Sequence, residues 1–170
     1  PKRDGMDELH KLLSKYSLEM AAIATGQSCL NDSMCLISTK KEKVQEAVRR
    51  LKGHIEIASE FGAAVIIGGI RGKFSGSATE KAEQRVSALN AVRFCAEKAI
   101  QNNVQLLIEP INRYETNFIN SAEDGLSFIE ATGHPEIKLL LDTFHMNLEE
   151  TDISQTIRKY ADQIGYIHFA

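Results

Sequence analysis

Short apolar runs alternate with longer stretches of helical spacing along most of the chain. The runs at 63–70 and 137–142 contain consecutive apolar residues without a 3.6-residue period, which is typical of strands buried on both faces. Strands are predicted at residues 18–25, 63–70, 104–109, 137–142 and 164–169. Because a helical stretch follows most of these runs, the pattern predicts βαβ units and a parallel sheet.

The helices are bounded by recognisable start and stop residues. Thr39 with Glu42, and Ser77 with Glu80, have the spacing of a capping box, and Gly62 suits the position just after a helix. Helices are predicted at residues 7–16, 40–61, from 77 to about 102, 121–133 and from 151 or 152 to about 161. Residues 27–38 are polar and are predicted to form a loop.

Two architectures fit this alternation: a doubly wound open sheet, or part of a (β/α)8 barrel. A full barrel needs eight strands and typically ~250 residues. The chain has 170 residues. As a barrel, it would therefore lack strands at both ends.

Three polar residues stand at the carboxyl ends of consecutive predicted strands: Glu109, Asp142 and His168. In a barrel such positions converge on one mouth. Two carboxylates and one imidazole suit a divalent cation such as Mn²⁺, Co²⁺, Mg²⁺ or Zn²⁺. Each residue also has an ordinary structural role open to it, as a turn cap, a helix N-cap or a buried core histidine. The spacing alone leaves both interpretations open.

The segments EPINRYE (109–115) and LDTFHMN (141–147) resemble the ketose 3-epimerases, the D-tagatose/D-psicose 3-epimerase group of xylose isomerase-like TIM barrels. The following GYIHF (165–169) is similar to the next strand of that group. The specific resemblance covers roughly the last third of the chain. Before Gln101 the resemblance is only in the architecture. It implies an α/β chain that forms an incomplete xylose isomerase-like (β/α)8 barrel, a single domain over residues 1–170 with about five of the eight strands.

The resemblance also implies roles for individual residues. Glu109 would bind the metal and exchange a proton with the sugar, while Asp142 and His168 would be further metal ligands. Glu115 and His145 would contact the substrate. The fourth metal ligand of the family is a glutamate on the last strand, which is also the second acid/base group and would lie beyond residue 170. We therefore expect these residues alone to be inactive.

The implied function is that of a metal-dependent sugar isomerase/epimerase, foremost a ketose 3-epimerase. It would remove the proton next to the carbonyl and pass through a metal-stabilised enediolate. Mn²⁺ or Co²⁺ is the favoured cofactor, with Mg²⁺ or Zn²⁺ as alternatives. The alternative functions are a hydroxypyruvate- or inosose-type isomerase on the same barrel and a catalytically inactive sugar-binding barrel.

The expected partner is a small sugar or sugar phosphate, to which Arg71 or Lys73 would be available. Asn112 and Arg113 are expected to organise their loop. Lys and Arg total 20 against 23 acidic residues, which predicts no broad attraction for nucleic acid. No apolar run approaches the ~20 residues of a membrane span, so no membrane partner is expected.

The three cysteines show no CxxC spacing. This favours thiols in a reducing compartment, and we expect a cytoplasmic protein. A homo-oligomer is compatible with all of these features.

Overall fold

The structure is a computed structural model that describes residues 3–26 and 34–170. Its centre is one sheet of five parallel strands whose spatial order follows the sequence. The strands are β1 (Ala22–Ala24), β2 (Ala64–Ile67), β3 (Leu106–Ile108), β4 (Lys138–Asp142) and β5 (Ile164–His168). A doubly wound sheet reverses its strand order at a switch point, and this sheet does not. The described strands are therefore part of a barrel.

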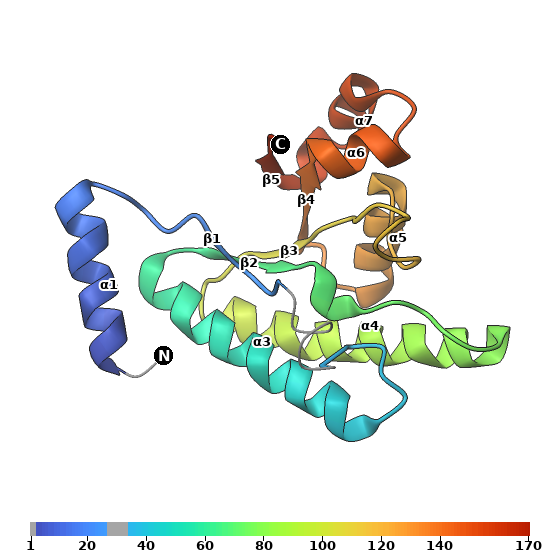
Figure 1. Cartoon of the computed structure of the whole chain (residues 1–170), viewed down its shortest axis with the longest axis horizontal. Coiled ribbons are helices and arrows are strands. Elements are labelled where there is room, and N and C mark those ends of the chain that lie inside the picture. Colours follow the sequence, from blue (N-terminus) through green and yellow to red (C-terminus); the bar gives the residue numbers. More distant parts are fainter. Residues whose placement is uncertain (1–2, 27–33) are drawn as a thin grey trace.

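Helix α1 (Arg3–Tyr16) precedes β1. The helices that connect the strands are α3 (Lys41–Phe61), α4 (Ala78–Gln101), α5 (Ala122–Thr132), α6 (Thr143–Glu149) and α7 (Ile153–Lys159). Two short 3-10 helices, η1 (Gly69–Arg71) and η2 (Ala161–Gln163), complete the connections. The long helices α3 and α4 lie side by side under the sheet (Figure 1). Among the described residues, no helix is both long and apolar enough to cross a membrane.

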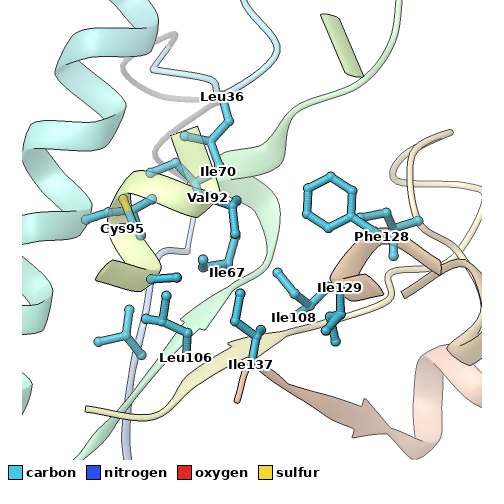
Figure 2. Close-up of a cluster of buried hydrophobic side chains, with 14 of the residues drawn as sticks. Leu36, Ile67, Ile70, Val92, Cys95, Leu106, Ile108, Phe128, Ile129 and Ile137 are labelled. Carbon is cyan, nitrogen blue, oxygen red and sulfur yellow. The ribbon is translucent and has the colours of Figure 1, made fainter. Parts of the chain in front are cut away.

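The two faces of the sheet are packed differently. Alternate residues of β2 to β4 join the buried residues of α3, α4 and α5 in one large core, part of which Figure 2 shows around Ile67, Leu106 and Ile108. The residues between them, Ile66, Leu107 and Leu140, form a small cluster on the opposite face. Because apolar side chains pack on both faces of the sheet, the strands appear in the sequence as continuous apolar runs.

Several details of the local structure differ from the prediction. The capping box of Ser77 and Glu80 is confirmed, as is a left-handed Gly62 after α3. The box predicted at Thr39 is wrong, because the N-cap of α3 is Lys40 and has no side-chain cap bond. Instead, the hydroxyl of Ser38 accepts a hydrogen bond from the Lys40 amide at 3.1 Å.

Helix α6 was not predicted from the sequence, and the strands are shorter than expected. The first part of the predicted loop at 27–38, including Cys29, lies outside the described residues. Cys95 is a buried free thiol, as expected. The expectation of a thiol is wrong for Cys35, which is disulfide-bonded. The division into one domain over residues 1–170 stays a prediction.

Candidate active site

The apolar cluster on the inner face of the sheet includes residues from four neighbouring strands: Ile66, Leu107, Leu140 and Tyr166. Side chains alternate along a strand, so residues two positions further on face the same way. These are Gly68, Glu109, Asp142 and His168. The three residues predicted from the strand ends therefore belong to one row at the inner, carboxyl rim of the barrel.

His168 reaches this row because β5 contains an extra residue. The pairing of β4 with β5 shifts between Leu139 and Leu140, which leaves Gly165 as a β-bulge. Beyond the bulge, Asp142 pairs with His168. In an unbroken strand the side-chain period of two would turn His168 towards the outer core instead. Bulges often occur next to active sites for this reason.

A group of potential metal ligands lies at the rim. Glu109, Asp142 and His145 each offer one ligand atom, and these atoms lie within 4.8 Å of one another. Nδ1 of His168 lies 3.6 Å from Oδ2 of Asp142. Oδ1 of Asp142 accepts a hydrogen bond from the Phe144 amide at 2.8 Å and so caps α6. Asp142 thus has one oxygen in a helix cap and the other directed to the rim.

The donor set of this group fits a divalent cation, since carboxylate oxygens and imidazole nitrogens are the common ligands of Mn²⁺, Co²⁺ and Zn²⁺. The ligands predicted from the sequence were Glu109, Asp142 and His168. The structure places His145 close to the same two carboxylates, from the first turn of α6. Two histidines therefore border one acidic pair, and His168 as the ligand stays a prediction.

The carboxylate of Glu109 lies against the backbone of the neighbouring loop. A Cβ atom on Gly68 would overlap Oε2 of Glu109, so glycine leaves the space that the carboxylate occupies. Burial raises the pKa of Glu109, while nearby His145, Arg71 and His168 oppose that rise. A raised pKa brings a carboxylate closer to the range in which it can both accept and return a proton near neutrality.

Arg71 is placed differently from the expectation. It was expected to be available at the barrel mouth, but its side chain is buried and only 1% exposed, whereas Lys73 is exposed. Nε and Nη1 of Arg71 have no hydrogen-bond partner among the described residues. Burial lowers the pKa of Arg71 to about 10, and nearby Glu109 opposes this fall. The guanidinium therefore remains a cation at neutral pH, buried beside the acid at the rim.

The loop after β3 is organised by Asn112. Its Oδ1 accepts a hydrogen bond from the Tyr114 amide at 3.0 Å. Its Nδ2 donates to Oε1 of Glu115 at 2.8 Å and lies 2.8 Å from Nδ1 of His145. Glu115 and His145, the two predicted substrate-binding residues, are therefore brought together by one amide. From the sequence, Asn112 was expected to organise this loop, but no pattern indicated its contact with His145.

Arg113 fastens the same loop to α6. Its Nε and Nη2 donate to the carboxylate of Glu149, and its backbone amide donates to Oε1 of Glu149 at 2.6 Å. These hydrogen bonds lower the pKa of Glu149 and raise the pKa of Arg113. The pair links the loop after β3 to the helix that carries His145.

Comparison with known proteins identifies the family. The model of the family described as xylose isomerase-like TIM barrel matches residues 1–170. The chain belongs to this family. Its expected fold, an incomplete xylose isomerase-like barrel, is thereby confirmed.

Among curated relatives of this xylose isomerase-like chain, the L-ribulose 3-epimerase of Methylomonas sp. (strain DH-1) is 31% identical over 160 residues, covering 92% of this chain and 54% of the relative. A putative hydroxypyruvate isomerase of Caenorhabditis elegans is 29% identical over 174 residues, covering 100% of this chain and 65% of the relative. A solved structure of L-ribulose 3-epimerase matches with a TM-score of 0.81 and 32% identity, covering 97% of this chain and 55% of that one. The chain thus spans about half the length of the 3-epimerases that it matches.

Proposed function

We propose that the full-length protein containing this chain is a metal-dependent ketose 3-epimerase. The observation that carries the proposal is the inward row of Glu109, Asp142 and His168 at one rim of a barrel. The similarity to an L-ribulose 3-epimerase supports it. Because the chain spans only about half of such relatives, the activity belongs to the longer protein.

Glu109 is the group that takes the proton from C3 of the sugar. Its partial burial beside Gly68 raises its pKa, which suits a group that must both accept and return a proton. The cation Arg71 opposes that rise and so favours the ionised, proton-accepting form. Inversion at C3 also needs an acid on the opposite face of the sugar, supplied by residues outside this chain.

Glu109, Asp142 and His168 would hold the cation. When bound, a divalent ion supplies positive charge where negative charge develops on the sugar oxygens. Mn²⁺ or Co²⁺ is the proposed ion, with Mg²⁺ or Zn²⁺ as alternatives. Glu115 and His145 bind the sugar beside it, and the substrate is a free or phosphorylated ketose.

The test is to incubate full-length protein with a panel of free and phosphorylated ketoses in D₂O. A ketose 3-epimerase inverts C3 and incorporates deuterium there. The Glu109→Gln variant should lose turnover by about 10³-fold, since positioned acid/base groups contribute 10²- to 10⁴-fold. Its circular dichroism spectrum should match that of the wild type.

The other candidate functions give different outcomes. The protein could instead convert hydroxypyruvate and incorporate no deuterium at C3 of any ketose. That result would favour a hydroxypyruvate isomerase, the activity in the name of the Caenorhabditis elegans relative. Sugar binding without turnover, and without a stoichiometric divalent ion, would favour a sugar-binding barrel. Unchanged turnover in Glu109→Gln would reject the role of this residue.

A further inference from the structure

The amide of Asn112 is buried, and its contacts define which end is oxygen and which is nitrogen. A backbone amide can only donate, so the atom that accepts from the Tyr114 amide at 3.0 Å is the carbonyl oxygen. Carboxylates only accept when ionised, so the atom 2.8 Å from Oε1 of Glu115 is the NH₂ group. Two independent contacts therefore assign the same orientation of the amide.

This orientation constrains the imidazole of His145. One hydrogen of the Asn112 NH₂ group is directed to Glu115, and the other is available to Nδ1 of His145, 2.8 Å away. An NH₂ group has no lone pair to offer in return, so Nδ1 must be the acceptor. The neutral ring then carries its hydrogen on Nε2. The backbone amide of Asn112, 3.5 Å from the same Nδ1, adds a second donor on that side.

We propose that Asn112 is a positioning residue that holds His145 in the Nε2–H form, so that His145 donates a hydrogen bond to an oxygen of the bound sugar. The inference deepens the proposed function and rests on it for the identity of the ligand. It also separates the two histidines at the rim. In His145, Nδ1 has its lone pair occupied by Asn112 and Nε2 bears a hydrogen, so neither nitrogen is free for a cation. His168 is then the histidine left to bind the ion.

The same amide places Glu115. Its Oε1 accepts from Asn112 and lies 4.0 Å from Nδ1 of His145, and the carboxylate remains 59% exposed. One buried side chain, itself 1% exposed, thus holds a donor and an acceptor at a fixed separation. A sugar carries neighbouring carbonyl and hydroxyl groups, which need one of each.

The experiment changes Asn112 to aspartate in the full-length protein. An aspartate at this position would have the shape of asparagine but only acceptor oxygens, so Nδ1 of His145 would have to become the donor and the hydrogen would leave Nε2. The Asn112→Asp variant and the wild type are labelled with ¹⁵N-histidine, and the tautomer is read by NMR at about pH 9, above the usual pKa range of histidine. The His145→Gln variant assigns the signal.

Asn117→Asp is the matched control. Asn117 lies in the same loop and also both accepts and donates, with the backbone amide and carbonyl of Phe74 as its partners. These partners are backbone atoms of another loop and not side chains of the rim. The same chemical change is thus made in the same loop, and the His145 tautomer and kcat should stay as in the wild type.

We expect Nε2–H in the wild type, Nδ1–H in Asn112→Asp, and a mixture in Asn112→Ala, which lacks both polar groups. In Asn112→Asp, kcat should fall by about 10²-fold, the usual cost of one donor to a developing oxyanion, with a smaller change in KM. Nδ1–H in the wild type, or a reversed tautomer with unchanged kcat, would overturn the proposal. The tautomer is read without substrate, so a wild-type protein that turns over no ketose would count against the proposed function alone.

Discussion

The inner rim and the loop after β3 position their side chains by different means. At the rim, Glu109, Asp142 and His168 are placed by the backbone: each lies two residues beyond an inward apolar residue of its strand. By contrast, Glu115 in the loop and His145 in α6 are placed by another side chain, the amide of Asn112. One set depends on strand register and the other on a few hydrogen bonds.

The two regions should therefore respond differently to amino-acid substitutions. Changes at the rim remove a chemical group from a fixed backbone, so we expect them to alter activity and metal binding while the fold persists. Changes in the loop remove hydrogen bonds that hold Glu115 and His145, so we expect them to alter how these side chains are oriented. Three predictions test this distinction, in order of expected effect.

Of these three substitutions, Asp142→Asn in the full-length protein is expected to have the largest effect. Asparagine is as good an N-cap as aspartate, so the bond to the Phe144 amide and the start of α6 should persist. The variant loses the negative charge beside His168. We expect the affinity for Mn²⁺, measured by calorimetry, and the turnover of ketose each to fall by at least about 10²-fold.

Asp152→Asn is the control for that substitution. Asp152 caps α7 through the Gln155 amide at 2.9 Å, in the same N-cap position as Asp142 but away from the rim. It should leave both metal affinity and turnover unchanged. Equal losses in the two variants would mean that the cap, and not the rim charge, explains the result.

A smaller effect is expected from Gly68→Ala. The new methyl group would overlap Oε2 of Glu109, which is the end of a flexible side chain, so the carboxylate moves and the backbone stays. A displaced acid/base group should lower kcat by about 10- to 100-fold with little change in Tm. Gly53→Ala, in the middle of α3 with open space around the position, should leave kcat unchanged and raise stability slightly. A large fall in Tm for Gly68→Ala would instead indicate a structural role.

The same distinction explains what could be predicted from the sequence. Strand ends are marked by apolar runs that stop at an acid or a histidine, so Glu109, Asp142 and His168 could be named as candidates. The choice of a barrel over a doubly wound sheet depends instead on the family resemblance of residues 109–115 and 141–147. The bulge at Gly165 has no signature in a five-residue strand, although it decides which face His168 occupies. The contact of Asn112 with His145 joins residues 33 positions apart and depends on the packing of α6.

The predicted capping box is confirmed at the start of α4 and wrong at the start of α3. The Ser77 box is confirmed, because its two hydrogen bonds lie within four consecutive residues. At Thr39 the same spacing is present, but the chain enters the helix one residue later and Ser38 takes the local bond. Helix α6 begins directly after β4, with Asp142 both the last residue of the strand and the N-cap, so no separate loop in the sequence marks its start.

The smallest effect is expected from Glu149→Gln, which weakens the attachment of the loop to α6. Hydrogen bonds from Arg113 hold the pKa of Glu149 below its usual value, so its contribution to stability is complete above the unfolded-state pKa and is lost as the pH falls through the lower folded-state pKa. The Tm difference between wild type and variant should therefore be constant from pH 7 down to about pH 5 and vanish in stronger acid. Turnover should fall by less than about tenfold, because a glutamine carbonyl can still accept the bond from the Arg113 amide and only the contacts with the largely exposed guanidinium lose their charge. A loss as large as that of Asp142→Asn would show that the bonds to Glu149 are what holds the loop in position.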